Sequence, residues 1–167
     1  VVTGASGFLG RYVAAHMRLK GNKVIAVSRR EGLGLHQVTD YAQSPAGDIL
    51  VHLAGEADRN QANRLGLQGL RNEWRVGEAL CSGRYRHVIY ASSAAVYGDQ
   101  HESSCSVEMP VVAHDAYSQS KLGIEQIVLE AGGAVVRLSN LYGLGMSANN
   151  VLSDILRQIP GEGPLRV

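Results

Sequence analysis

Short apolar runs alternate along the chain with longer amphipathic segments. Four runs are rich in aliphatic and β-branched residues, at positions 23–27, 48–53, 87–91 and 134–138, and Val1 and Val2 open the chain in the same way. Residues 36–38 are expected to add a short edge strand. Strands that are apolar throughout are typical of a parallel sheet buried on both faces. The pattern therefore predicts such a sheet.

The amphipathic segments predict helices over 11–20, 59–81, 116–131 and 150–158. Glycines at 21 and 132–133 and Pro160 supply their stop signals, while three glycines weaken the second helix. Residues 97–115 are expected to form a loop with several acidic side chains. Strands that alternate with helices predict an α/β fold with a doubly wound, Rossmann-type sheet, whose ligands bind at the carboxyl ends of the strands.

The domain organisation follows from the same pattern. Residues 1–145 are expected to form a dinucleotide-binding domain, and residues 146–167 to begin a substrate-binding region that is largely missing. Because the sequence starts inside a predicted strand without Met and stops where another strand is expected to begin, we interpret it as a fragment of a longer protein.

Composition excludes several classes of protein. The chain has 167 residues, of which 45% are apolar and 19% charged, and a net charge of +1 offers no basic face for nucleic acid. We see no apolar run of membrane-spanning length and no signal peptide. Cys81 and Cys105 lack the spacing of a metal site or a disulfide framework. These features favour a cytoplasmic protein without a metal.

The opening sequence V-V-T-G-A-S-G-F-L-G places Gly4, Gly7 and Gly10 between a strand and a helix. Glycine lets the chain turn sharply, lets a pyrophosphate approach the backbone, and lets the helix pack closely. The backbone N–H groups from Ser6 to Leu9 are expected to face the phosphates at the positive end of the helix dipole. This order predicts a dinucleotide site.

A second stretch, Y-S-Q-S-K, places Tyr117 and Lys121 four residues apart on one helix face. A neighbouring ammonium stabilises a phenolate, so we expect Lys121 to lower the pKa of Tyr117 and make it an acid/base. Ser93 lies at the carboxyl end of a predicted strand, where its hydroxyl could bind the same substrate oxygen. These three residues are the candidate catalytic set.

Five motifs together resemble the extended short-chain dehydrogenase/reductases, and among them the nucleotide-sugar epimerases and reductases. T-G-A-S-G-F-L-G is similar to the family's TGxxGxxG, and D-I-L-V-H-L-A-G to its DxVxHLAA. S-S-A-A-V-Y-G, Y-S-Q-S-K and R-L-S-N-L-Y-G resemble SSxxVYG, YxxxK and RxxNxYG. The resemblance covers nearly the whole chain and implies that Ser93, Tyr117 and Lys121 are catalytic, with Lys121 also binding the nicotinamide ribose.

The resemblance and the strand-end positions together give the expected binding residues. The cofactor is expected to contact Gly4, Ser6, Gly7, Phe8, Leu9, Gly10, Ser28, Arg29, Arg30, Asp40, Tyr41, Leu53, Ala54, Gly55, Tyr117 and Lys121, with Asp40 and Tyr41 flanking the adenine. The substrate is expected to contact Ser93, Ala94, Ala95, Tyr117, Asn140 and Asn150, the two asparagines on its diphosphate side.

Three departures from the family pattern change the expectation. Ser28, Arg29 and Arg30 stand where NAD-preferring members have an acidic residue, which favours NADP, with NAD possible. Ala94 and Ala95 stand where dehydratases have an acidic pair, which argues against a 4,6-dehydratase. The NxxGT motif has no clean counterpart, and Asn63 is a poor fit to it.

The sequence therefore predicts an NAD(P)-dependent nucleotide-sugar epimerase that acts by reversible hydride transfer. An NADPH-dependent ketoreductase of a 4-keto nucleotide sugar is the alternative, because it needs the same three side chains. A non-catalytic NADP(H) sensor is a third interpretation, which the presence of both Tyr117 and Lys121 disfavours. A homodimer is possible, as in many members of the family that the sequence resembles.

Overall fold

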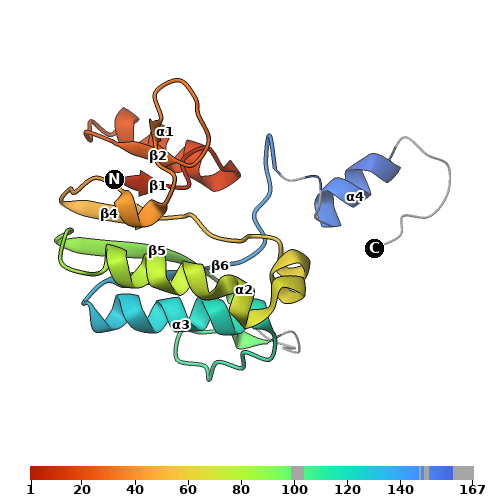
Figure 1. Cartoon of the computed structure of the whole chain (residues 1–167). Helices are drawn as coiled ribbons and strands as arrows, with labels where there is room; N and C mark the ends of the chain where they lie inside the picture. The colour runs from red at the N-terminus through yellow and green to blue at the C-terminus, as the bar shows by residue number, and fades with distance from the viewer. Residues whose placement is uncertain (99–103, 147, 149–150, 160–167) are drawn as a thin grey trace.

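In the computed structural model, which describes residues 1–98, 104–146, 148 and 151–159, a parallel six-stranded sheet forms the centre of the molecule (Figure 1). The strand order is β3-β2-β1-β4-β5-β6. The strands are β1 (Val2–Thr3), β2 (Ala26–Ser28), β3 (His36–Gln37), β4 (Ile49–His52), β5 (His87–Ser93) and β6 (Ala134–Leu138). The order reverses between β1 and β4, so the predicted doubly wound α/β fold is confirmed.

Helices connect the strands as the sequence predicts. They are α1 (Phe8–Leu19), α2 (Arg59–Leu80), α3 (Ala116–Glu130) and α4 (Val151–Gln158), with short 3₁₀ turns η1 (Tyr41–Gln43) and η2 (Ala94–Tyr97). The prediction started the first helix three residues late, because Gly7, with an extended backbone, is its N-cap. No helix in the described part of the chain is long and apolar enough to cross a membrane.

The two faces of the sheet carry separate hydrophobic clusters. Leu50 of β4 and Tyr90 of β5 lie on one face, packed with Leu80 of α2 and Ile124 of α3. Val51 belongs to the other cluster, which includes Ala14 of α1. Because successive strand residues point to opposite faces, α2 and α3 cover one face of the sheet and α1 the other. Figure 1 shows α2 and α3 side by side.

A kink at Gly66 divides α2. Gly66 has φ +64° and ψ 176°, a conformation outside the helical region that glycine adopts readily. Of the three glycines that weakened the prediction of this helix, only Gly66 interrupts the helical conformation. At Gly77 the helix keeps its regular conformation and lies close to α3: a Cβ added there would be 3.4 Å from Ile124. The kink lets the first turns of α2 follow a different direction from the packed remainder.

A buried charge network joins α3 to the last two strands. Glu125 is 2% exposed, receives hydrogen bonds from Arg137 of β6 at 2.7–3.1 Å, and accepts another from the Ser92 hydroxyl. Arg137 also donates to the Tyr97 hydroxyl at 2.8 Å. Multiple hydrogen bonds make such a buried pair tolerable. The network fixes α3 against the strand that ends at Ser93.

Candidate active site

The predicted site residues lie at the carboxyl edge of the sheet. Gly4 follows β1, the 53–55 segment follows β4, and Ser93 ends β5. A Cβ added to Gly4 would meet the backbone of Leu53 and Ala54 at 2.9 Å, so these two segments abut. The positions expected to bind the cofactor after β1 and β4 are thus adjacent in space.

The glycine turn has the tight geometry that the sequence predicts. Gly4 has φ +68°, and its carbonyl oxygen accepts the N–H of Gly7 at 2.9 Å. A Cβ on Gly10 would lie 2.1 Å from that same oxygen, so only glycine fits there. The opening N–H groups of a helix lack intrahelical acceptors, and those of α1 follow directly from this turn. The turn from Gly4 to Gly7 and the start of α1 therefore suit the binding of a dinucleotide pyrophosphate.

The end of β2 bonds back to the glycine turn. Ser28 is fully buried, and its hydroxyl donates to the Ser6 hydroxyl at 2.8 Å and accepts the N–H of Arg30 at 2.9 Å. The exposed Arg29 guanidinium lies 5.4 Å from the centre of the Tyr41 ring. Ser28 thus fixes the local backbone, and the two arginines remain on the surface beside the turn.

Asp40 is engaged within the protein. Its carboxylate accepts the N–H of Ala42 at 2.9 Å and pairs with Arg75 of α2. The hydrogen bond from Ala42 and the charge of Arg75 hold the pKa of Asp40 below its usual value. Asp40 therefore anchors η1, which carries Tyr41, to α2.

Ser93 and Tyr117 are brought together by η2. The Ser93 hydroxyl accepts the N–H of Ala95 at 3.2 Å, and the carbonyl of Ala95 accepts the Ser118 hydroxyl at 3.2 Å. Burial raises the pKa of Tyr117, although a hydrogen bond with Ser93 lowers it in part. The expected fall in the pKa of Tyr117 was wrong, because burial outweighs the hydrogen bond with Ser93 and the charge of Arg59.

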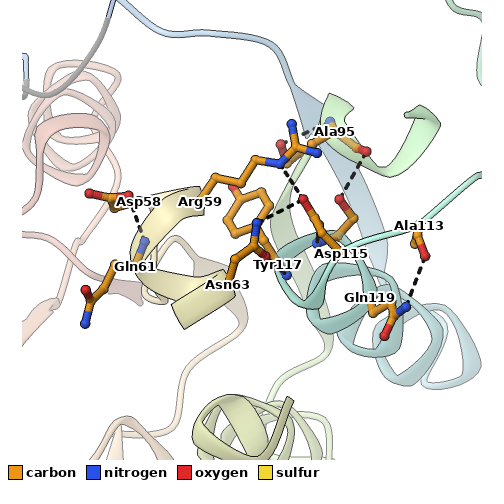
Figure 2. Close-up of polar contacts among 11 residues, drawn as sticks. Asp58, Arg59, Gln61, Asn63, Ala95, Ala113, Asp115, Tyr117 and Gln119 are labelled. Atoms are coloured by element: carbon orange, nitrogen blue, oxygen red, sulfur yellow. Dashed lines mark hydrogen bonds and ion pairs between the residues drawn. The ribbon is translucent and has the colours of Figure 1, made fainter. Parts of the chain in front are cut away.

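Three residues outside the predicted set hold the start of α3, as Figure 2 shows. Asp115 caps the helix by accepting the N–H of Ser118 at 2.8 Å. It also accepts from Arg59 Nε at 2.5 Å and from Asn63 Nδ2 at 3.2 Å. Asn63 Oδ1 accepts the backbone N–H of Tyr117 at 3.0 Å. The first turns of α2 therefore hold Tyr117 in place.

Lys121 is buried beside a carboxylate. Its side chain is 7% exposed, and Nζ lies 4.0 Å from Oε2 of Glu73 on α2. Nζ also lies 5.3 Å from the centre of the Tyr117 ring, as expected for one helical turn. Burial lowers the pKa of Lys121, and the charges of Glu73 and Glu56 oppose that effect. The predicted Tyr–Lys pair is present, with an acidic partner that the sequence analysis missed.

Two buried polar side chains lie next to this pair. His52 Nδ1 bonds the Thr3 hydroxyl at 2.7 Å, and burial lowers the pKa of His52 to about 3. Its ring stacks on Tyr90, whose hydroxyl has no hydrogen-bond partner among the described residues. Lys121 Nζ lies 6.0 Å from the Tyr90 ring. His52 is thus a neutral core residue rather than an acid/base at neutral pH.

The predicted substrate residues are placed only in part. Ala94 and Ala95 begin η2, and Asn140 is exposed just after β6. Asn150 lies outside the described residues. The chain after Asn140 turns back to α1, where Arg11 donates to the carbonyls of Leu144 and Gly145 at 2.8 and 2.9 Å. Within the described residues, no group of three His, Cys, Asp or Glu side chains could hold a metal.

A signal for one of the missed residues is present in the sequence. Glu73 is in phase with Leu70, Gly77 and Leu80, which are buried along α2. A carboxylate on the buried side of a helix needs a positively charged or hydrogen-bonding partner. The position of Glu73 in phase with these residues therefore marked it as a candidate site residue. Asn63 and Arg59 carried no comparable signal, because the kink at Gly66 breaks the helical phase between them and the buried residues.

Comparison with known proteins gives one family match over the entire chain. The profile of the NAD dependent epimerase/dehydratase family matches residues 1–167. A UDP-glucose 4-epimerase of Cyamopsis tetragonoloba, GEPI48, is 24% identical over 158 residues, which cover 76% of this chain and 45% of that protein. The chain spans about half the length of the curated relatives it matches.

Two solved structures have the same fold. An NAD-dependent NDP-hexosamine 5,6-dehydratase, TunA, superposes with a TM-score of 0.83 at 20% identity, over 95% of this chain and 60% of that chain. MoeE5 in complex with UDP-glucuronic acid and NAD gives a TM-score of 0.77 at 25% identity, over 94% of this chain and 60% of that chain.

Proposed function

The chain belongs to the NAD-dependent epimerase/dehydratase family, and on this premise we propose that it is the dinucleotide-binding part of a nucleotide-sugar epimerase. In this proposal residues 1–145 hold the cofactor, and the chain from 146 onward leads into the substrate region. The observation that carries the proposal is the convergence of Ser93, Tyr117 and Lys121 beside the 53–55 segment, which abuts Gly4. The relatives named for UDP-sugar epimerisation support the substrate class.

The protein's own groups would position the sugar and move its proton. Ser93 would hold the reacting hydroxyl or carbonyl oxygen by a hydrogen bond, and Tyr117 would take or return the proton on that oxygen. Lys121 would place a positive charge next to the phenol and stabilise its ionised form. A bound nicotinamide would supply the hydride acceptor and donor.

Tight glycine contacts support the fit of a dinucleotide. Any side chain at Gly10 would collide with the Gly4 carbonyl, and any side chain at Gly4 with the 53–55 segment. Such glycines are typical of a backbone that closes around a pyrophosphate. We infer NADP(H) as the preferred form, because Arg29 and Arg30 are exposed next to the turn and no acidic residue ends β2. NAD, which MoeE5 binds, is the alternative.

A ketoreductase remains the second candidate, since Arg29 beside Tyr41 offers a cationic and aromatic surface for an adenosine 2′-phosphate. An epimerase regenerates its cofactor in each cycle, whereas a reductase consumes it. The cytoplasmic setting and the homodimer expected from the sequence stay predictions.

The test is a stoichiometry measurement with UDP-hexoses and UDP-4-keto-hexoses. For the epimerase, NMR should show many equivalents of the C4 epimer formed per cofactor, with no net change in nicotinamide oxidation. For the reductase, one equivalent of NADPH should be consumed per hydroxyl formed. Turnover of neither substrate class would contradict both forms of the proposal and favour a sensor.

A further inference from the structure

Glu73 lies in an unusual place for a charged residue. It stands on the side of α2 that faces α3 and the sheet, with a side chain only 19% exposed. Its Oε2 lies 4.0 Å from Lys121 Nζ, and its Oε1 accepts the backbone N–H of Glu56. A carboxylate that is removed from water in this way is stable only with such partners.

The geometry leaves little room around the pair. A Cβ added to Gly55 would lie 3.2 Å from Lys121 Nζ and 3.4 Å from Oε1 of Glu73. The ammonium, the carboxylate and the Gly55 backbone therefore fill one small space beside the 53–55 segment. The bond from Glu56 fixes the carboxylate from the loop side, so the carboxylate in turn fixes where the ammonium lies.

We propose that Glu73 is a positioning residue, which holds the Lys121 ammonium against the segment after β4 and keeps it charged. The inference rests on the proposed function, in which Lys121 serves Tyr117. Glu73 would act through Lys121 and touch neither the sugar carbon nor the phenol proton.

The charges around Lys121 explain why a partner is needed. Glu73 faces it from α2 and Glu56 from the loop before α2, and both favour the ammonium. Tyr90 of β5 and Tyr117 of α3 present ring faces, while the charge of Lys121 helps keep His52 of β4 neutral.

Burial alone would drive Lys121 toward the neutral amine. Without Glu73, Lys121 should lose its proton at a lower pH. Glu73 also raises the pKa of Tyr117, which Ser93, Arg59 and Asp115 further influence. Removal of the Glu73 charge should therefore lower the pKa of both Tyr117 and Lys121. The acid limb and the alkaline limb of the pH profile of kcat/KM should then both move to lower pH.

The chain suits a direct measurement, because it has three lysines, and Lys20 and Lys23 are exposed. Lysine labelled with ¹³C at Cε gives one NMR titration curve for each side chain. We would record these curves for the wild type, for Glu73→Gln, and for Glu78→Gln, which removes an exposed carboxylate from the same helix. The pH profile of kcat/KM would be recorded for the same proteins.

In Glu73→Gln the Lys121 midpoint should fall by about one pH unit or more, the size of effect expected of a close opposite charge. The curves of Lys20 and Lys23 should not move, and Glu78→Gln should match the wild type. Where the activity can be measured, its alkaline limb should fall with the Lys121 midpoint. Glu73→Asp retains the charge but shortens the side chain, and serves if the glutamine variant does not fold. In it the midpoint should fall by less.

An unmoved Lys121 midpoint in the folded variant would overturn the inference, even if the enzyme turns over as proposed. A midpoint shift in a protein that turns over no nucleotide sugar would support the Glu73–Lys121 pair and contradict the proposed function instead.

Discussion

The side-chain carbonyl of Asn63 accepts the backbone N–H of Tyr117 at 3.0 Å, across 54 residues of sequence. The same amide donates to Asp115, the N-cap of α3. One exposed side chain at the start of α2 therefore holds both the cap of α3 and the residue that carries the phenol. The position of Tyr117 depends on α2 as much as on its own helix.

Replacement of Asn63 by Ala should lower kcat clearly while it lowers the free energy of unfolding only slightly. The variant loses two hydrogen bonds, at a cost of about 1 kcal/mol in the free energy of unfolding. It also releases the first turn of α3, so kcat should fall while cofactor affinity stays near the wild-type value. Asn72→Ala is the control, because Asn72 bonds Arg75 on an exposed part of α2. Equal kcat in Asn63→Ala and Asn72→Ala would show that the Asn63 contacts have no catalytic role.

Asp115 should give the stability of the protein an acid-dependent component. Burial favours its neutral form, but hydrogen bonds from Ser118, Arg59 and Asn63 hold the pKa of Asp115 well below its usual value. In the unfolded chain this pKa is about 4. The stabilisation is therefore present above about pH 4 and is lost as the pH falls toward the folded-state pKa.

Asp115→Asn keeps a capping side chain and removes the charge. We expect it to lower the free energy of unfolding by about 1–2 kcal/mol at pH 7. The gap to the wild type should close as the pH is lowered below 4, as urea denaturation at several pH values would measure. A gap that stays constant down to pH 3 would be the contrary result.

Gly55 should not tolerate a side chain. Its φ is +149°, and an added Cβ would press on Lys121 Nζ at 3.2 Å. Gly55→Ala should therefore displace the ammonium by a few tenths of an ångström and lower kcat/KM by about tenfold, less than the roughly hundredfold loss that a 1 Å displacement causes. Gly143 has the same φ but an open position, with Phe8 at 3.6 Å. Gly143→Ala carries the same backbone strain, so similar kcat/KM losses in the two variants would assign the effect to strain alone.

The arginines after β2 should determine the choice of cofactor. NADPH should bind at least tenfold more tightly than NADH, and Arg29→Ala should remove most of that difference, because a guanidinium binds a phosphate by charge-assisted hydrogen bonds. Arg86 precedes β5 and so lies at the amino ends of the strands, whereas Arg29 follows the carboxyl end of β2; Arg86→Ala should therefore leave both affinities unchanged. Calorimetric titration would measure all of them. Equal binding of the two cofactors, or tighter binding of NADH, would remove the argument for NADP.

Local patterns were sufficient to predict much of the fold and the principal side chains. The strand, glycine turn and helix at the N-terminus needed only ten consecutive residues, and Tyr117 and Lys121 needed only one helical turn. Strand ends were less accurate, because β2 begins three residues later than predicted, where pairing with β1 starts.

The contacts that position these side chains could not be predicted in the same way. The Asn63–Tyr117 and Glu73–Lys121 contacts join α2 to α3 over long sequence separations. The Asn63 contact also lies on the far side of the kink at Gly66 from the packed part of α2. The net pKa shift of Tyr117 depends on burial, which its neighbours in sequence do not reveal.

The most direct test of the account is Tyr117→Phe, which retains the ring and removes the hydroxyl. Turnover of the nucleotide sugar should fall by about 10²–10⁴-fold, the usual contribution of an acid/base group, while cofactor affinity stays unchanged. Tyr85 lies just before β5, and its hydroxyl donates to the Pro45 carbonyl at 2.8 Å. The control variant Tyr85→Phe loses that hydroxyl and should keep its activity. If Tyr117→Phe turned over the sugar at the wild-type rate, the phenol would not be the acid/base and the central claim would be wrong.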